Sequence, residues 1–209
     1  DIDDIQQALK GYESYVHLDA ALFGGYLQAS EFASDLYSVG PNGKRYDSIS
    51  VSCHKFFGFP TIAGIFITNK STFEEYRDYF SKVHDPAYIS HVPGTITCSR
   101  DSLKPALFHY FSTDQSFAQQ SVDAEAILAN AEYLHKEMQS HFPELETKRA
   151  NDRSNTLYFK PVDIKVKKKW TLATIGRDPS EALAHVVIMP HATKPYLDRF
   201  LEDLEKYKA

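Results

Sequence analysis

Short segments rich in apolar residues, separated by turn formers, predict three short β-strands in the first third of the chain. They cover residues 14–18, 47–52 and 62–68. In the second strand, Ile49 and Val51 share one face and serine hydroxyls occupy the other, which is typical of a half-buried strand. The loop that joins the second and third strands is short and contains turn-forming glycine and proline.

Apolar residues at helical spacing predict the main helices. Residues 71–74 read Ser-Thr-Phe-Glu, a capping box, so a helix is expected to begin there and to run through Phe80. Residues 84–105 hold three prolines and are expected to form a loop. A long amphipathic helix is expected over residues 116–140, with an apolar face made of Ile127, Ala131, Leu134 and Met138.

The end of the chain alternates between strand and helix patterns. Strands are expected over residues 156–159 and 185–189, and a final amphipathic helix over residues 196–204. This order predicts a small α+β unit. We therefore divide the chain into a first domain, residues 1–112, and a second domain, residues 113–209, which opens with the long helix.

The composition excludes several classes of protein. With 23 basic and 28 acidic residues the formal charge is −5, which argues against a nucleic-acid partner. No apolar run approaches the ~20 residues of a membrane helix, and the acidic N-terminus lacks the pattern of a signal peptide. Two cysteines, Cys53 and Cys98, are too few for a disulfide framework. We expect a cytoplasmic protein with no membrane contact.

Candidate chemistry lies after the first and second predicted strands. Asp19 and Lys55 each follow a strand beside small residues, where open α/β sheets place ligands. Taken alone, Lys55 is more simply an ordinary surface lysine. Together with Ser52 and His54, however, these residues form the set required by a cofactor that bears a ring nitrogen, an aldehyde and a phosphate. The nine histidines show no ligand spacing on a helix, so no metal site is expected.

Five segments, in order along nearly the whole chain, carry a resemblance to a known family. They are residues 17–21 (His-Leu-Asp-Ala-Ala), 47–55 (ending Ser-Cys-His-Lys), 95–100, 170–174 and 184–190. The chain resembles the group II pyridoxal-phosphate decarboxylases, and most of all the bacterial histidine decarboxylases and plant serine decarboxylases. The resemblance implies an α/β fold of the aspartate-aminotransferase type (fold type I), here the C-terminal part of the large domain followed by a small α+β domain.

The resemblance also implies roles for the residues at the strand ends. Lys55 would be the Schiff-base lysine, and Asp19 the carboxylate that faces the pyridine nitrogen of pyridoxal 5'-phosphate. A carboxylate there keeps the nitrogen protonated, so that the ring can accept electrons when carbon dioxide leaves. Ala21 would lie on one face of the ring, where a larger side chain would displace it.

Further residues are implied to bind the phosphate. Ser52 and His54 resemble phosphate ligands, and Ser99 resembles a residue that reaches the phosphate across a dimer interface. The family often has glycine where this chain has Cys53 and Cys98. A nucleophilic thiol beside His54 is one interpretation, but a small side chain that fits where glycine did is the simpler one.

The implied activity is decarboxylation of a small L-amino acid, with histidine as the best single guess for the substrate. Serine or another small amino acid is an alternative, as is a silent fragment that only binds partner chains. An aminotransferase on the same fold is disfavoured, because the Asp-Ala-Ala and His-Lys patterns resemble decarboxylases.

The family's chain begins well before the position of Asp1. The resemblance therefore implies that an N-terminal chain or segment completes the large domain, and that two such units form a homodimer-type assembly. Left alone, the apolar side of the three strands would meet water, and on that side we place Val16, Ile49, Val51, Ile65 and Ile67.

Overall fold

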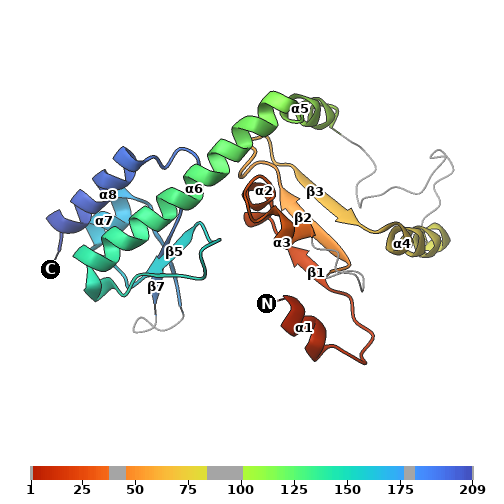
Figure 1. The fold of residues 1–209 in the computed structure, drawn as a ribbon, viewed down its shortest axis with the longest axis horizontal. Helices are drawn as coiled ribbons and strands as arrows, with labels where there is room; N and C mark the ends of the chain where they lie inside the picture. The colour runs from red at the N-terminus through yellow and green to blue at the C-terminus, as the bar shows by residue number, and fades with distance from the viewer. Residues whose placement is uncertain (1, 38–45, 84–100, 177–181, 209) are drawn as a thin grey trace. The chain divides into compact units, whose positions relative to one another are not determined.

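The computed structural model describes residues 2–37, 46–83, 101–176 and 182–208, and it divides the chain into two compact units (Figure 1). Unit 1 comprises Asp1–Gln28 and Ala33–Phe117, and unit 2 comprises Ala29–Phe32 and Ala118–Ala209. No helix in the described ranges combines the length and the apolar character that crossing a bilayer requires.

Unit 1 is built on a three-stranded sheet of β1 (His17–Asp19), β2 (Ser48–Ser52) and β3 (Gly64–Thr68), in the order β1-β2-β3. Strands β1 and β2 run parallel, whereas β3 runs antiparallel to β2. All three predicted strands are confirmed, although the first begins three residues later than expected. Since β1 and β3 each pair on one side only within the described residues, both outer edges of this sheet have unpaired backbone groups.

Five helices lie entirely within the described residues of unit 1, namely α1 (Ile2–Ala8), α2 (Phe23–Gln28), α3 (Ala33–Tyr37), α4 (Lys70–Val83) and α5 (Leu103–Phe111). The predicted helix corresponds to α4, but the capping residue is Asn69 and not Ser71. The side-chain oxygen of Asn69 accepts the amide of Thr72 at 3.0 Å and the hydroxyl of Ser71. Both residue types cap helices, and the one that begins the turn here lies two positions earlier.

The two faces of the sheet in unit 1 differ in character. The serine face carries His17, Asp19, Ser48, Ser50, Ser52 and Phe66, as the strand registers show. On the other face, Ile49 and Val51 are buried, because α2 lies against them: a Cβ on Gly24 would come within 2.8 Å of Val51 Cγ2. The expectation that these two side chains meet water is therefore wrong.

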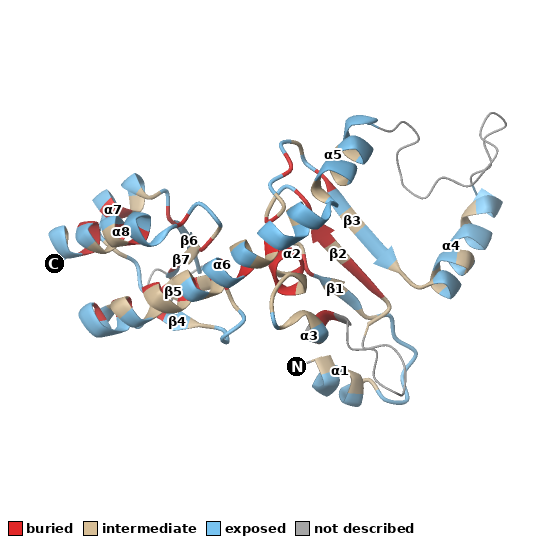
Figure 2. Cartoon of the chain, turned by 45° about the horizontal axis from the view of Figure 1, so that its top comes forward, coloured by how far each residue is buried: buried red, intermediate tan, exposed pale blue. Residues whose placement is uncertain are grey.

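The exposed apolar side chains of the sheet lie on β3. Figure 2 shows β2 as buried and β3 as largely exposed. Phe66 is 61% exposed and Ile67 is 53% exposed, whereas Ile65 and Val16 are half-buried. Within the sheet of unit 1, the unburied apolar surface is thus concentrated on β3.

Unit 2 contains a four-stranded antiparallel sheet in the order β4-β5-β7-β6. Its strands are β4 (Lys148–Arg149), β5 (Thr156–Phe159), β6 (Ala173–Ile175) and β7 (Leu183–Val187). Its helical segments are α6 (Asp114–His141), which begins in unit 1, η1 (Pro143–Leu145), α7 (Ile164–Lys169) and α8 (Lys194–Lys206). The predicted long helix and small α+β unit are confirmed.

The core of unit 2 joins helix faces to the sheet. Residues from α6, β5 and α8 meet there, including Leu134, Met138, Leu157, Phe159, Leu197, Phe200 and Leu204. At its margin, Trp170 Nε1 donates to the buried carboxylate of Asp203 at 2.8 Å, and Lys169 Nζ lies 2.6 Å from the same oxygen. The hydrogen bond from Lys169 lowers the pKa of Asp203 despite its burial, so this carboxylate ties the end of α7 to α8 as a charged group.

Candidate cofactor site at the ends of β1 and β2

The candidate residues Asp19, Ala21 and Ser52 lie at one edge of the sheet in unit 1. Asp19 ends β1 and Ser52 ends β2. Because the two strands are parallel, their carboxyl ends share an edge, and Asp19 pairs in register with Ser50. The segments beyond the strands are also joined, since the amide of Ser52 donates to the carbonyl of Ala21 at 3.2 Å.

The carboxylate of Asp19 is exposed and oriented by its own turn. One oxygen, Oδ1, accepts the amide of Ala21 at 3.1 Å. The next residue, Ala20, is fully buried, and its amide donates to the carbonyl of Ser50 at 3.0 Å. The other carboxylate oxygen, Oδ2, has no hydrogen-bond partner among the described residues, so it is available to a ligand.

Helix α2 links the end of β1 to the turn that carries Lys55. A Cβ on Gly24 would lie 2.8 Å from the Cβ of Ala20, and one on Gly25 would lie 2.7 Å from the Cβ of Phe56. Both distances are shorter than side chains tolerate, so glycine is required at both positions. At both glycines, the groups that lie against the helix backbone are side chains of the protein itself.

The turn between β2 and β3 fixes the backbone around Lys55. The amide of Cys53 donates to Ala63 at 2.9 Å, and its carbonyl accepts the amide of Phe59 at 3.2 Å. The thiol of Cys53 is fully buried, and burial raises its pKa to about 11. A thiol that stays protonated is a poor nucleophile, so the simpler interpretation of Cys53 is favoured. Cys98 lies outside the described residues.

His54 and Lys55 lie next to each other in the turn that follows β2. His54 is exposed, and its Nδ1 lies 3.1 Å from the carbonyl of Ala63. Because a carbonyl only accepts, Nδ1 carries the proton and the ring is held by it. Lys55 is half-buried, its carbonyl accepts the amide of Gly58, and its Nζ has no hydrogen bond or ion pair with a described residue.

These groups fit a cofactor with a ring nitrogen, an aldehyde and a phosphate. The carboxyl ends of β1 and β2 supply the carboxylate of Asp19 and the hydroxyl of Ser52. The turn after β2 supplies the imidazole of His54 and the amine of Lys55. Ser99, the sixth candidate residue, lies outside the described residues. Within the described ranges, no group of three or more potential ligand residues could hold a metal ion.

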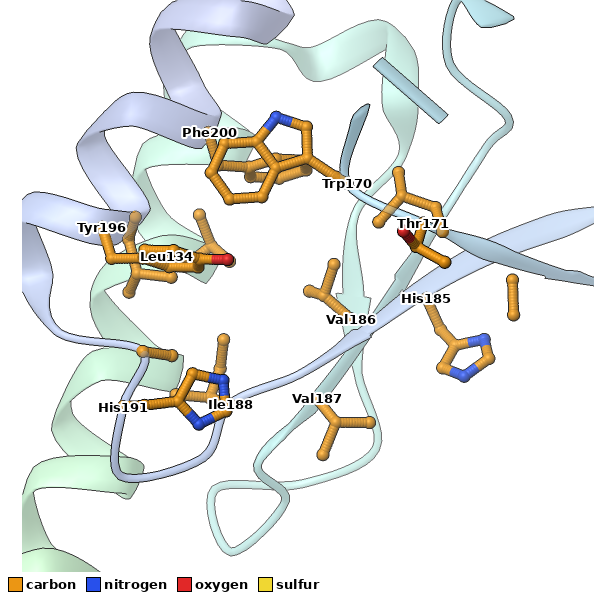
Figure 3. A pocket seen from close by; sticks show the side chains of 14 residues that line it. Leu134, Trp170, Thr171, His185, Val186, Val187, Ile188, His191, Tyr196 and Phe200 are labelled. Carbon is orange, nitrogen blue, oxygen red and sulfur yellow. The ribbon is translucent and has the colours of Figure 1, made fainter. Parts of the chain in front are cut away.

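A cavity of about 260 Å³ lies in unit 2 (Figure 3). Trp170, Tyr196 and His191 line it together with apolar residues of β7 and α8. His185 also lines it, and its buried Nδ1 has no hydrogen-bond partner in the described part of the chain. The cavity is a gap at the margin of the unit 2 core and contains none of the candidate residues.

Sequence reasoning gave His17 no role beyond its place in a motif. The structure places its ring on the serine face, in contact with Ser48 and Ser50. The signal was present in the chain, because serines at alternating positions 48, 50 and 52 must share one face of a strand. Which neighbouring strand they meet depends on the register, which the sequence does not reveal.

Comparison with known proteins gives histidine decarboxylases and serine decarboxylases as relatives. The chain is 32% identical over 213 residues to a histidine decarboxylase of Solanum lycopersicum, an alignment that covers 98% of this chain and 46% of the relative. It is 31% identical to serine decarboxylase 2 of Oryza sativa subsp. japonica, over 99% of this chain and 42% of the relative. The chain therefore spans less than half the length of these curated relatives. No family model matches the sequence.

The fold has relatives among solved structures. L-methionine decarboxylase from Streptomyces sp. 590 superposes with a TM-score of 0.72 at 22% identity, covering 93% of this chain and 42% of that chain. At this level of identity the likeness concerns the fold alone. It confirms the expected fold type I architecture, of which this chain is a C-terminal portion.

Proposed function

Because the chain is similar over nearly its whole length to the C-terminal part of the group II pyridoxal-phosphate-dependent amino-acid decarboxylases, we propose that it is the cofactor-bearing part of such an enzyme. The observation that carries the proposal is the position of Asp19 and Ser52 at the carboxyl ends of two paired parallel strands, with His54 and Lys55 in the turn that follows β2. We assign residues 1–112 to the large domain and residues 113–209 to the small one.

When bound, pyridoxal phosphate supplies an electron-accepting ring that takes up the electron pair left by departing carbon dioxide. Lys55 holds the cofactor through its amine, which is available because no described residue pairs with it. Once the substrate's own amine takes its place, the protonated Lys55 amine would be positioned to give a proton to the substrate carbon.

Asp19 acts on the ring nitrogen. Its Oδ2, which has no hydrogen-bond partner among the described residues, would accept the N–H of the protonated ring, and Oδ1 would keep its bond to the amide of Ala21. The carboxylate thereby keeps the proton on the nitrogen and the ring electron-poor. The methyl group of Ala21 leaves room for the ring, which a longer side chain at this position would displace.

Ser52 and His54 hold the phosphate. Ser52 ends β2, and the His54 ring is anchored through Nδ1 to the carbonyl of Ala63, so the imidazole is oriented before the cofactor arrives. Ser99 of a second copy is proposed to complete the phosphate site. The assembly is then a dimer in which each cofactor contacts both subunits.

We propose L-histidine as the substrate, with L-serine as the second candidate because serine decarboxylases are among the relatives. The test supplies the complete enzyme with cofactor and with carboxyl-labelled L-histidine, L-serine or L-methionine in turn. Release of labelled carbon dioxide together with the corresponding amine, fastest from histidine, is expected. No release from any of the three by an enzyme that binds cofactor would contradict decarboxylation. Faster release from serine than from histidine would make L-serine the substrate in place of L-histidine.

The native enzyme is also proposed to contain a segment that completes the sheet of unit 1. Both outer edges of the described sheet are unpaired, and Phe66 and Ile67 remain more than half exposed on β3. Exposing a large apolar side chain costs about 1.5–3 kcal/mol. The isolated 209-residue chain is therefore expected to aggregate or to melt without cooperativity.

Light scattering coupled to size exclusion, followed by thermal melting, measures this property. The matched control is the complete enzyme, which is expected to elute as a dimer and to melt cooperatively. A monodisperse, cooperatively melting monomer of 23.8 kDa would show that the isolated chain needs no further segment.

A further inference from the structure

The imidazole of His17 lies on the serine face of the sheet, where three side chains contact it. His17 Nδ1 lies 2.7 Å from Ser48 Oγ, and His17 Nε2 lies 3.2 Å from Ser50 Oγ. The ring of Phe66 on β3 stacks against it, with centroids 5.9 Å apart and planes inclined by 21°. Although His17 is exposed, both of its ring nitrogens and one of its faces are occupied, so its position is fixed by β2 and β3.

His17 occupies the same face of β1 as Asp19, two residues before it. Side chains alternate along a strand, so Leu18 points to the opposite face. Strand β1 is three residues long and pairs with β2 at three positions only. Backbone hydrogen bonds tie both ends of β1 to β2, from the amide of Asp47 to the carbonyl of Val16 at 2.8 Å and from the amide of Ala20 to the carbonyl of Ser50 at 3.0 Å. Between these ends, His17 adds two side-chain hydrogen bonds to β2 on the face that carries Asp19.

Ser50 connects His17 to the carboxylate. Its hydroxyl contacts His17 Nε2, its carbonyl accepts the amide of Ala20, and it is the register partner of Asp19. Ser50 thus holds the side chain two residues before Asp19 and the backbone amide directly after it. The turn amide of Ala21 then fixes the carboxylate itself.

We infer that His17 is a positioning residue, which locks β1 to β2 through Ser48 and Ser50 and so aims the carboxylate of Asp19 at the ring nitrogen of the cofactor. A serine hydroxyl both donates and accepts, so the two contacts form whether the imidazole is neutral or charged. The role is accordingly geometric. It rests on the proposed function, because it concerns the same cofactor site.

The test uses the complete enzyme and cofactor labelled with ¹⁵N at the ring nitrogen. In His17→Leu, both hydrogen bonds are lost, and the dissociation constant of the cofactor is expected to rise about tenfold. The ¹⁵N resonance should move toward its unprotonated position, because the carboxylate no longer faces the nitrogen consistently. We expect kcat to fall about tenfold with KM within about twofold. His17→Gln, which can still reach one serine, should recover part of each loss.

Thr68→Val provides the matched control. Thr68 lies on the serine face and donates its hydroxyl to the carbonyl of Asp47 at 2.9 Å, without a described contact to His17. Its replacement removes one cross-strand hydrogen bond from that face. It should lower the melting temperature while leaving cofactor affinity and the ¹⁵N resonance unchanged.

His17→Leu with wild-type cofactor affinity and ¹⁵N resonance would overturn the inference, whatever its melting temperature. Should that variant fail to fold, Ser50→Ala decides: a rise of about threefold in the dissociation constant supports the inference and a wild-type value overturns it. A wild-type enzyme that takes up no cofactor would overturn the proposed function and this inference with it. Normal cofactor uptake by both wild type and variants overturns the inference alone.

Discussion

Replacing Lys55 by alanine in the complete enzyme is expected to abolish covalent cofactor attachment and to lower decarboxylation by about 10⁴-fold or more. The loss combines two functions of one amine, which holds the cofactor and then moves a proton. The fold should survive, because Lys55 Nζ makes no hydrogen bond or ion pair with a described residue, and its backbone bond to Gly58 does not depend on the side chain.

Visible absorbance of the cofactor and release of carbon dioxide measure the two functions separately. Lys82→Ala is the matched control, since Lys82 is an exposed lysine in the last turn of α4 in the same unit. That variant should keep activity within about twofold. A Lys55→Ala enzyme that retains the absorbance of covalently bound cofactor would exclude Lys55 as the attachment site.

Replacing Asp19 by asparagine is expected to slow decarboxylation by about 10²–10⁴-fold while cofactor still binds. The amide oxygen of asparagine can keep the hydrogen bond from Ala21, so the turn is preserved and only the charge at the ring nitrogen is lost. Without that charge the nitrogen loses its proton more readily, and the ring accepts electrons less well.

Single-turnover rates measured at saturating cofactor isolate this effect from binding. Asp78→Asn serves as the control, because Asp78 is an exposed carboxylate on α4 whose partner is Arg77 at 3.5 Å. It should turn over at the wild-type rate. Turnover of Asp19→Asn within threefold of wild type would remove the carboxylate from the mechanism.

Much of the architecture could be predicted from side-chain periodicity. The strand around Ile49 alternates between apolar and polar residues, and α6 carries apolar residues at helical spacing, so local pattern and final environment agree. Helix α2 could not be predicted in this way. It is six residues long and contains Gly24 and Gly25, both poor helix formers, and it exists because tertiary contacts with Val51 and Phe56 hold it.

The chemistry of the site was easier to predict than its geometry. Asp19 and Lys55 could be singled out because a carboxylate and an amine follow predicted strands. Their relation depends on the parallel pairing of β1 with β2, which is a long-range contact across about thirty residues of sequence. His17 was overlooked for the same reason, since its partners Ser48 and Ser50 become its neighbours only in that register.

The central claim is that this chain carries the lysine that binds pyridoxal phosphate. It is tested most directly by reducing the complete, cofactor-loaded enzyme with borohydride, digesting it and locating the pyridoxyl group by mass spectrometry. The account predicts one modified peptide, which contains Lys55 within the sequence Ser-Cys-His-Lys. A pyridoxyl group found on any other lysine, with Lys55 unmodified, would contradict it.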